Sequence, residues 1–490
     1  MKKKFIWPLL FASCFLSRFA FAAPDSERIT DLETKIETLQ QQFQSSKTNP
    51  ARDADVRSGN SSGISYKGVN IQLGGFLASE TIYRNNNTAS DIGTSYAKIP
   101  FANNAGFGSA EVRGTERQSR FSLLASGDYD SETHISGYYE LDFLGTSPTA
   151  NANESNSFTP RTRNVYMSID WDSGLHLLAG QAWSLVTLNT KGITPRSEYI
   201  PPTIDAQYAV GFDWARQWQI RLTKDWSKTF WLALSAENAQ TVGVSGTAAT
   251  GTGNTYQLAA GSLMSNNLSL NTYPDVISKF AYESSFGHFE VYDLMRNIQS
   301  LYGGATLATQ TNRQSDWTNA VGAGLTVPLL AKSFDLSLSG LIGQGIGRYG
   351  TGQLSDATYA SDGSLTPLSG SQYLAQLIWH PSTQLDAYVL YGQEQVSANL
   401  GPVATFGYGD GAVTSNAGCA SLGGTCAPNV KSLGQLNLGV WWSFYKGNFG
   451  AAKLGVEYSH LDLATYADKA GQNPTTKEEM LFTSLRFYPF

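Results

Sequence analysis

The side chains of this sequence that could act on a passing solute are charged residues on the polar side of alternating segments. The set consists of Arg120, Arg221, Arg296, Glu140, Asp142 and Glu237. Residues of the opposite parity in each segment are largely apolar, so we expect the charges on the aqueous face. Facing rows of base and acid would create a transverse field that orients polar solutes. The alternative is that these charges merely pair across a wide, water-filled space.

The sequence lacks the usual motifs for catalysis or for holding a cofactor. The stretch GIGRYG at 345–350 fits G-x-G-x-x-G, but it lacks the strand, helix start and βαβ context that a dinucleotide site needs. The five histidines are scattered, with no metal-ligand pair at short spacing, and there is no G-x-S-x-G elbow. We therefore predict no catalytic residue, no metal and no cofactor, and a chain that is not an enzyme.

The stretch HISGYYELDF at 134–143 indicates how such charges are positioned. Every second residue is apolar or small, as at Ile135, Tyr139 and Leu141, and Glu140 and Asp142 stand between them. This pattern predicts a β-strand with one apolar and one polar face. In a soluble sandwich the apolar face would cover a protein core, whereas in an outer-membrane barrel it would face lipid.

The same alternation recurs along the chain, for example at 69–83, 120–126, 230–238 and 451–460. Alternation alone does not exclude a soluble sandwich. Three features favour a membrane protein: aromatic residues near strand ends, a chain that ends in Phe490, and about 420 residues of strand pattern without a helical domain. With roughly 25 residues for each strand and its loop, we predict an all-β transmembrane barrel of about 16 antiparallel strands, with about 14 or 18 as alternatives.

Two segments break the alternation. Arg161 and Arg163 share parity with the apolar Val165. Near the C-terminus, Arg486 shares parity with Tyr488. A β-bulge would explain either exception, because one inserted residue changes the face on which the neighbouring side chains lie.

The first 22 residues have the features of a secretory signal peptide. Three lysines precede an apolar stretch, and an Ala-Phe-Ala cleavage site ends at Ala22. A retained anchor is the alternative, but Arg18 interrupts an apolar run that is short for a membrane span. No later segment approaches the roughly 18 to 20 uninterrupted apolar residues of a membrane helix. If the exported chain sits in a membrane, it must therefore do so as a closed barrel.

Residues 23–47 form a separate segment. Its apolar residues follow a 3-4 heptad spacing, at Ile29, Leu32, Ile36, Leu39 and Phe43. This narrow stripe predicts a short α-helical coiled coil between chains that other contacts tether. A single amphipathic helix on its own barrel or on a membrane surface is the alternative. The polar, Gly- and Ser-rich residues 48–66 are predicted as a linker, and residues 67–490 as the barrel.

The composition fits a chain of many strands and tight turns. Aromatic residues make up 12% and charged residues only 15%, and there are 48 glycines. The formal net charge is −6, and removing a leader with four positive charges would make it −10. This acidic balance argues against nucleic acid as a partner.

Two cysteines remain once Cys14 leaves with the leader. Cys419 and Cys426 close a small Gly-rich loop in what should be an oxidising compartment. We therefore predict a disulfide between them, with two free thiols as the alternative.

Fragments over nearly the whole mature chain resemble the DcaP-like outer-membrane porins. They are ELDF at 140–143, LLAGQAWS at 177–184, VGFDWARQWQIRL at 210–222, YPDVISK at 273–279, GQGIGRY at 343–349, LYGQE at 390–394, GYGDG at 407–411, and the paired Cys419 and Cys426. The resemblance implies a homotrimeric barrel of about 16 strands, an N-terminal periplasmic coiled coil, and passive uptake that favours small anions such as dicarboxylates. The acidic net charge does not itself support anion preference.

The Pro-rich segment 189–214 follows a strand and is the best candidate for an inward-folded constriction loop. It carries Lys191, Arg196, Glu198 and Asp205. A porin selects by pore width and by charge at its constriction, so Arg196 joins the predicted pore-lining residues. An ordinary extracellular loop or a trimer latch is the alternative.

Together these features predict a diffusion porin of the bacterial outer membrane for small hydrophilic solutes, with its N-terminal segment in the periplasm. An outer-membrane barrel enzyme is one alternative, although such enzymes tend to have smaller barrels and a compact catalytic site. A structural protein that links envelope layers through the coiled coil is another. An active transporter would need about 22 strands and a plug domain, for which residues 23–66 are too few.

Overall fold

The computed structural model describes residues 63–88, 90–145, 158–242, 255–258, 271–304, 312–330, 333–360, 364–400, 407–409, 416–426 and 428–490. The predicted leader, the coiled-coil segment and nearly all of the predicted linker lie outside these residues. The last part of that linker, Ile64–Tyr66, forms β1 and pairs with the following strand. Within the described ranges, no helix is both long and apolar enough to cross a membrane.

Sixteen antiparallel strands form a closed barrel in the described part of the chain, which confirms the predicted number. They are β2 (Val69–Arg84), β4 (Arg120–Asp128), β5 (Thr133–Asp142), β6 (Arg161–Trp171), β7 (Leu175–Trp183), β8 (Arg216–Trp226), β9 (Phe230–Glu237), β11 (Asp275–Ser284), β12 (Gly287–Gly304), β13 (Asn312–Leu329), β14 (Phe334–Gln344), β17 (Ser369–Ser382), β18 (Leu385–Val396), β21 (Val430–Gly447), β22 (Gly450–Thr465) and β23 (Thr475–Tyr488). Each strand pairs with the next along the barrel, and β23 returns to β2, so no barrel edge is left open.

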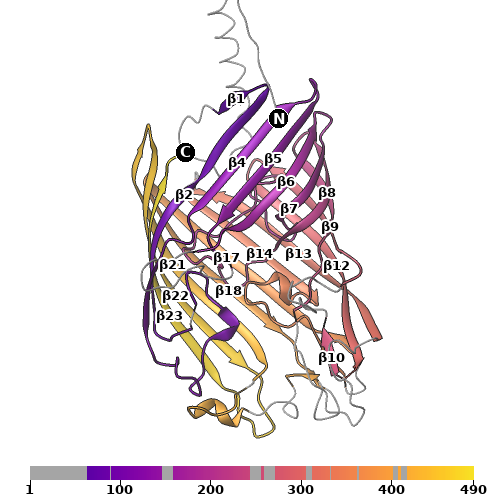
Figure 1. Ribbon diagram of the computed structural model, residues 1–490, viewed down its shortest axis with the longest axis vertical. Coiled ribbons are helices and arrows are strands. Elements are labelled where there is room, and N and C mark those ends of the chain that lie inside the picture. Colours follow the sequence, from indigo (N-terminus) through magenta and orange to yellow (C-terminus); the bar gives the residue numbers. More distant parts are fainter. Residues whose placement is uncertain are drawn as a thin grey trace, which may run out of the picture. The chain divides into compact units, whose positions relative to one another are not determined.

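Shorter elements decorate the barrel and its loops. They are β3 (Glu111–Thr115), β10 (Thr255–Leu258), β15 (Ala357–Tyr359), β16 (Leu365–Pro367), β19 (Asn399–Leu400), β20 (Gly407–Tyr408) and the 3-10 turns η1 (Tyr96–Lys98), η4 (Gly347–Tyr349) and η5 (Ala417–Ala420). Short turns such as 285–286 and 383–384 connect strands at one end of the barrel, and long loops connect them at the other (Figure 1). Short periplasmic turns and long outer loops are typical of outer-membrane barrels.

Apolar side chains cover the outside of the barrel. On β9, Phe230, Leu232 and Leu234 are 46%, 48% and 55% exposed, whereas the alternate residues Trp231 and Ala233 are 4% and 1% exposed. A soluble sandwich would bury this large apolar set, so that alternative is wrong for the described strands. The charged and polar residues of the other parity point inward, where they avoid the cost of about 2 to 4 kcal/mol for an Arg or Lys that faces lipid at mid-membrane.

The two exceptions to the alternation have different causes. Between β5 and β6 the register shifts after Glu140, which pairs with Asn164, while Leu141 pairs with Thr162. Arg163 is therefore the extra residue of a β-bulge and is buried beside Asn164. The bulge proposed for this segment is confirmed.

No bulge occurs at Arg486, so that explanation was wrong for the last strand. The pairing of β22 with β23 runs without interruption, with Arg486 opposite Lys453. Arg486 lies on the inner face and pairs with Glu80 at 2.8 Å. Tyr488 follows on the same face, because its ring packs 5.3 Å from the inward-facing Phe76. The last strand carries interior aromatic residues instead of a register shift.

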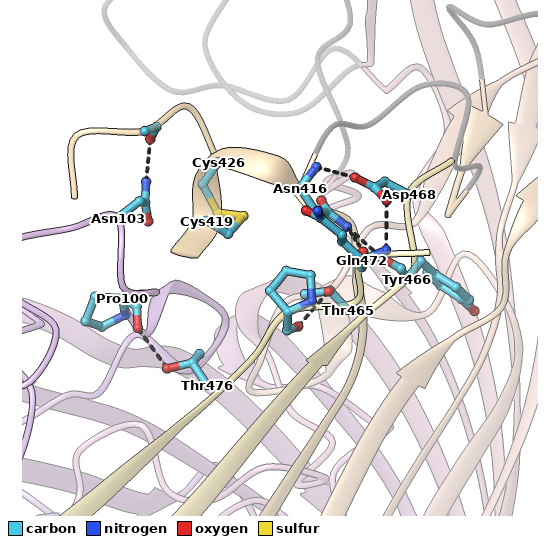
Figure 2. Close-up of a disulfide and its surroundings, with 12 residues drawn as sticks. Pro100, Asn103, Asn416, Cys419, Cys426, Thr465, Tyr466, Asp468, Gln472 and Thr476 are labelled. Atoms are coloured by element: carbon cyan, nitrogen blue, oxygen red, sulfur yellow. Dashed lines mark hydrogen bonds between the residues drawn. A yellow bond between two sulfur atoms is a disulfide. The ribbon is translucent and has the colours of Figure 1, made fainter. Parts of the chain in front are cut away.

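The predicted disulfide between Cys419 and Cys426 is confirmed. It closes a loop that begins at η5, above the long-loop end of the barrel (Figure 2). The loop is held to the segment around Asn103: the Asn103 Nδ2 donates to the Gly424 carbonyl at 2.9 Å, and the Gly423 N–H donates to the Asn103 carbonyl at 2.9 Å. The disulfide therefore stabilises a contact between two loops that are far apart in sequence.

Replacing both cysteines by serine is expected to loosen this loop without unfolding the barrel. The free energy needed to open this loop locally should fall by about 2 to 3 kcal/mol, because the disulfide limits the open conformations of a short ring. Limited proteolysis should show faster cleavage within 416–426, while the temperature of barrel unfolding stays unchanged. Equal cleavage rates in the oxidised wild type and the double variant would contradict the expectation.

Candidate functional site

Residues 184–215, between β7 and β8, fold into the barrel interior and reach strands on its far side. The Gly211 N–H donates to the Glu394 Oε1 on β18 at 2.9 Å, and the Val210 N–H donates to the Gln435 Oε1 on β21 at 2.8 Å. The Trp441 indole N–H donates to the Pro202 carbonyl at 2.7 Å. The expected inward-folded segment is therefore observed, and we refer to 184–215 as the inner loop.

Carboxylates on the barrel wall hold the backbone of the inner loop. Glu237 accepts a hydrogen bond from the Leu185 N–H at 3.0 Å, and Glu290 accepts one from the Asn189 N–H at 3.1 Å. Glu394 accepts from the Gly211 N–H, and Glu457 from the Ile204 N–H. These four side chains are at most 3% exposed. Each bond satisfies a loop N–H that would otherwise be buried without a partner, so the acids act as anchors of the loop.

Apolar side chains reinforce the same attachment. Ile204 and Phe212 of the inner loop belong to a buried cluster with Leu390 and Phe482, which are inward-facing wall residues. Burying each such side chain contributes about 1.5 to 3 kcal/mol. The loop is thus fixed by an internal core, on the side of the barrel formed by β17 to β23 and β2.

Two glycines permit the close approach of loop and wall. Gly211 has φ +81°, and a Cβ there would lie 2.0 Å from the Tyr373 carbonyl oxygen. A Cβ at Gly392 on β18 would lie 1.7 Å from the Val210 carbonyl oxygen. Neither position accommodates a side chain while the loop stays in place.

Four arginines of β4, β6 and β8 lie around Glu140 and Asp142, and Arg196 of the inner loop lies over the ring of Tyr138 beside them. We call these five, Arg120, Arg161, Arg163, Arg196 and Arg216, the arginine cluster. Their closest ion pairs are Arg120 Nε to Glu140 at 3.0 Å, Arg163 Nε to Glu140 at 3.0 Å, Arg163 Nη1 to Asp142 at 2.9 Å, and Arg161 Nη2 to Asp142 at 2.6 Å. Glu198 of the inner loop interacts electrostatically with Tyr166, as Arg196 does, so the five cations face three anions and the local charge is positive.

Arg196 and Arg216 of the cluster are supported by aromatic rings. Arg216 lies 5.1 Å from the centroid of Trp183 and 5.2 Å from that of Trp214, and Arg196 lies 5.5 Å from that of Tyr138. Neither guanidinium forms an ion pair with a described carboxylate, although Arg216 is close enough to interact electrostatically with Glu140. Both side chains are half-buried. Cation–π contacts fix these charges without neutralising them.

The structure brings together only part of the set that the sequence proposed. Arg120, Glu140, Asp142 and Arg196 meet in the arginine cluster. Arg221 lies apart, 3% exposed, and donates to the Gln219 Oε1 at 3.0 Å and to the Trp183 carbonyl.

The remaining two residues of the proposed set hold loops in place. Arg296 is fully paired with Asp275 and Asp356, each at 3.1 Å, and Asp356 belongs to the loop between β14 and β17. Glu237 anchors the inner loop and also accepts a hydrogen bond from the Gln217 Nε2 at 2.6 Å. Both are buried structural contacts in the described part of the chain.

Sequence reasoning missed Arg161, Arg163 and Arg216 as members of the cluster. The signal for the first two was their anomalous parity, which the bulge at Arg163 explains. Arg216 begins β8 on the parity of the outward-facing Trp218, yet its guanidinium lies over the ring of Trp183 and interacts with Tyr208. Alternation of residue types carries no information about such contacts at a strand end.

Comparison with solved structures addresses the fold. The structure of the outer membrane channel DcaP of Acinetobacter baumannii matches with a TM-score of 0.60 at 17% sequence identity, over 87% of this chain and 99% of that chain. The barrel has the fold of the DcaP channel. Salmonella typhi OmpF, in complex with daunomycin, matches with a TM-score of 0.46 at 9% identity, over 87% of this chain and 100% of that chain. No protein-family model and no curated protein sequence matches the chain.

Asp213 is a buried carboxyl of the inner loop, but its side chain forms no described hydrogen bond that would attach the loop to the wall. It is 2% exposed, and neither oxygen accepts a hydrogen bond from a residue that the structure describes. Burial, with the nearby Glu394 as a second cause, raises the pKa of Asp213 well above its usual range. An acid whose pKa is higher in the folded state makes folding less favourable as the pH rises above its unfolded value of about 3.9.

Replacing Asp213 with the isosteric leucine is therefore expected to stabilise the protein at neutral pH. The gain should be about 1 to 3 kcal/mol, the cost of burying an unpaired polar group. Thermal unfolding at several pH values should show the variant above wild type near pH 7.5 and the two converging towards about pH 4. Asp142→Leu is the matched control, and it should destabilise the barrel because Arg161 and Arg163 would lose their partner. A lower unfolding temperature of Asp213→Leu at neutral pH would contradict the expectation.

Proposed function

We propose that this chain is an outer-membrane diffusion porin for small hydrophilic solutes, and that it favours anions such as dicarboxylates. The observation that carries the proposal is the arginine cluster beside the inner loop. Its five guanidinium groups exceed the three neighbouring carboxylates, and Arg196 and Arg216 keep half-buried charges without a described carboxylate partner.

The acidic net charge of the chain does not oppose anion preference, because the interior acids are engaged elsewhere. Glu237, Glu290, Glu394 and Glu457 accept backbone N–H groups of the inner loop and are closed off from the lumen. Selectivity depends on the charged groups at the constriction and not on the total charge. Under this proposal the positive arginine wall determines the field that a solute meets.

The inner loop is proposed as the constriction. The loop reaches across the interior and is attached to the wall at several points, and under this proposal it narrows the lumen. Arg196 on the loop and Arg216 at its end would then lie beside the narrowed passage. A dicarboxylate could accept hydrogen bonds from two guanidinium groups at once, and bidentate pairs of this kind are strong and geometrically specific.

The remaining sequence expectations belong to the same proposal. Residues 1–22 would direct export, residues 23–47 would form a periplasmic coiled coil that supports a homotrimer, and residues 48–66 would connect it to the barrel. The apolar outer face of the strands supports insertion in the bacterial outer membrane.

Planar-bilayer recording with the mature chain tests this function. Under a salt gradient the reversal potential should lie on the anion side, and channels should close in steps of three if the protein is a trimer. Succinate and other small dicarboxylates should pass more readily than cations of similar size. Cation preference would overturn the anion proposal, and a folded barrel without any conductance would overturn the porin proposal.

A further inference from the structure

Three histidines repeat one arrangement, in which each ring nitrogen contacts a different aspartate. The contacts are His134 Nδ1 to Asp128 at 2.5 Å and Nε2 to Asp172 at 3.2 Å, His176 Nδ1 to Asp170 at 2.7 Å and Nε2 to Asp225 at 3.0 Å, and His380 Nδ1 to Asp386 at 2.7 Å and Nε2 to Asp335 at 3.1 Å. We call these sites the histidine bridges.

All three bridges lie at the short-turn end of the barrel. His134 is the cross-strand partner of Asp128, and His176 is that of Asp170. His380 and Asp386 flank the turn between β17 and β18. The second aspartate of each bridge comes from the strand or turn on the other side, so each histidine links three neighbouring strands.

The bridges face the interior of the barrel. His176 shares parity with the buried Leu178, and His380 shares parity with the buried Gln376. His134 shares parity with Glu140 of the arginine cluster. The imidazole side chains are 33%, 20% and 31% exposed for His134, His176 and His380, so protons from solution can reach them.

The geometry of each bridge favours the imidazolium form. A neutral imidazole has one N–H donor and one acceptor nitrogen, whereas the imidazolium has two donors. Only the imidazolium can donate to both aspartates. With the proton, a bridge carries a local charge of about −1, and without it about −2. The three bridges together therefore change the charge of this mouth by about three units.

Acidic groups outnumber basic ones around the bridges. Two lysines lie nearby: the Lys224 side chain donates to the Ser173 carbonyl next to Asp172, and the Lys228 N–H donates to Asp225 at 2.9 Å. Asp130 interacts electrostatically with His134, and together with Glu132 and Asp172 it lines an open hollow of about 330 Å³ next to that bridge. The ring of Trp231 stacks 5.7 Å from that of His176. Negative charge thus dominates the surroundings, so loss of the imidazolium charges strengthens an existing acidic field.

The two other histidines differ from the histidine bridges in their burial or in the face of the barrel on which they lie. His288 contacts Glu283 at 2.5 Å and Glu290 at 3.0 Å, but it is only 1% exposed, and Lys279 also pairs with Glu290. His460 contacts Glu479 at 2.6 Å and Asp462 at 3.0 Å on the outer face of the barrel. It shares parity with the exposed Val456 and Tyr458, so its charge lies outside the lumen.

We propose that the three histidine bridges form a proton-sensitive ring at the short-turn mouth of the pore and set the pH dependence of its ion selectivity. The proposal rests on the proposed porin function, because it requires ions to pass this mouth. In acid the protonated bridges weaken the negative field and anions pass more readily. In alkali the mouth becomes more acidic and the same pore admits more cations.

The test compares reversal potentials at pH 5.5 and pH 8.0 for the mature wild type, the triple variant His134→Gln, His176→Gln and His380→Gln, and the control His460→Gln. The wild type should show an increase in the chloride-to-potassium permeability ratio of at least about twofold on acidification. The triple variant should lose most of this shift, since glutamine gains no proton. His460→Gln should keep it.

The outcomes separate this inference from the porin function. An unchanged pH shift in the triple variant, or an equal loss in His460→Gln, would overturn the inference while the channel still conducts. A folded wild type without conductance would overturn the porin function itself. If the triple variant does not fold, the three single variants replace it, and each should lose about a third of the shift. Single variants that all retain the full shift would contradict the inference.

Discussion

Changing Arg196 and Arg216 to glutamate is expected to convert an anion-preferring channel into a cation-preferring one. Together with Glu140, Asp142 and Glu198, the arginine cluster would change from five cations and three anions, a formal charge of +2, to three cations and five anions, a formal charge of −2. Neither arginine has a described carboxylate partner, so the exchange leaves no ion pair broken. The chloride-to-potassium permeability ratio should fall by about tenfold or more, since charge at a narrow, low-dielectric passage acts strongly on ions.

The matched control for this exchange is Arg313→Glu. Arg313 lies on β13 with the parity of the exposed Trp317, so it carries the same charge on the outer face of the barrel. Its substitution should leave the reversal potential unchanged. Anion preference that survives in the double glutamate variant would show that the arginine cluster does not determine selectivity.

Replacing Gly392 with valine is expected to widen the channel. The new side chain would occupy the position of the Val210 carbonyl oxygen, which lies 1.7 Å from the Cβ site. Valine suits a β-strand, so β18 itself should form normally. The inner loop would have to leave the wall, and it would lose its bonds to Glu394 and Gln435. Single-channel conductance should rise by about a factor of two or more, because the loop would no longer restrict the lumen.

A second readout follows from the same change. The inner loop carries Arg196 and ends beside Arg216, so its displacement should also weaken the selectivity of the channel. Gly434→Val is the matched control: Gly434 lies on the outer face of β21, and a Cβ there would meet only the Tyr391 hydroxyl, at 3.5 Å. Wild-type conductance in a folded Gly392→Val barrel would show that the inner loop is not the constriction.

The sequence by itself determined the architecture of the barrel. Strand patterns such as 134–143 and 230–238 depend on neighbours two residues apart, and the face of each residue follows from the pleat alone. The strand number followed from dividing the chain into units of similar length. The Cys419–Cys426 pair could also be predicted, because the two cysteines are only seven positions apart and the ring is local.

Contacts between distant segments were decided by the tertiary structure. The wall partners of the inner loop lie between 52 and 253 residues away in sequence, as with Glu237 for Leu185 and Glu457 for Ile204. The strand pattern alone predicts that Glu237 lines the pore. Only the folded inner loop shows that its carboxyl group accepts a hydrogen bond from a backbone N–H. The histidine bridges were missed for the same reason, since the second aspartate comes from another strand.

The arginine cluster depends both on the alternation within its strands and on contacts made only in the folded barrel. Alternation identified Arg120, Glu140 and Asp142 as inward-facing, because each follows the regular period of its strand. It misplaced Arg163, where a bulge changes the face, and it gave no sign that Arg216, at the start of its strand, lies over the ring of Trp183. Parity is a property of a regular strand, and bulges and strand ends depart from it where pairing with neighbouring strands or packing against a loop overrides it. The sequence therefore determined which faces are polar, and only the folded barrel decided which charges meet.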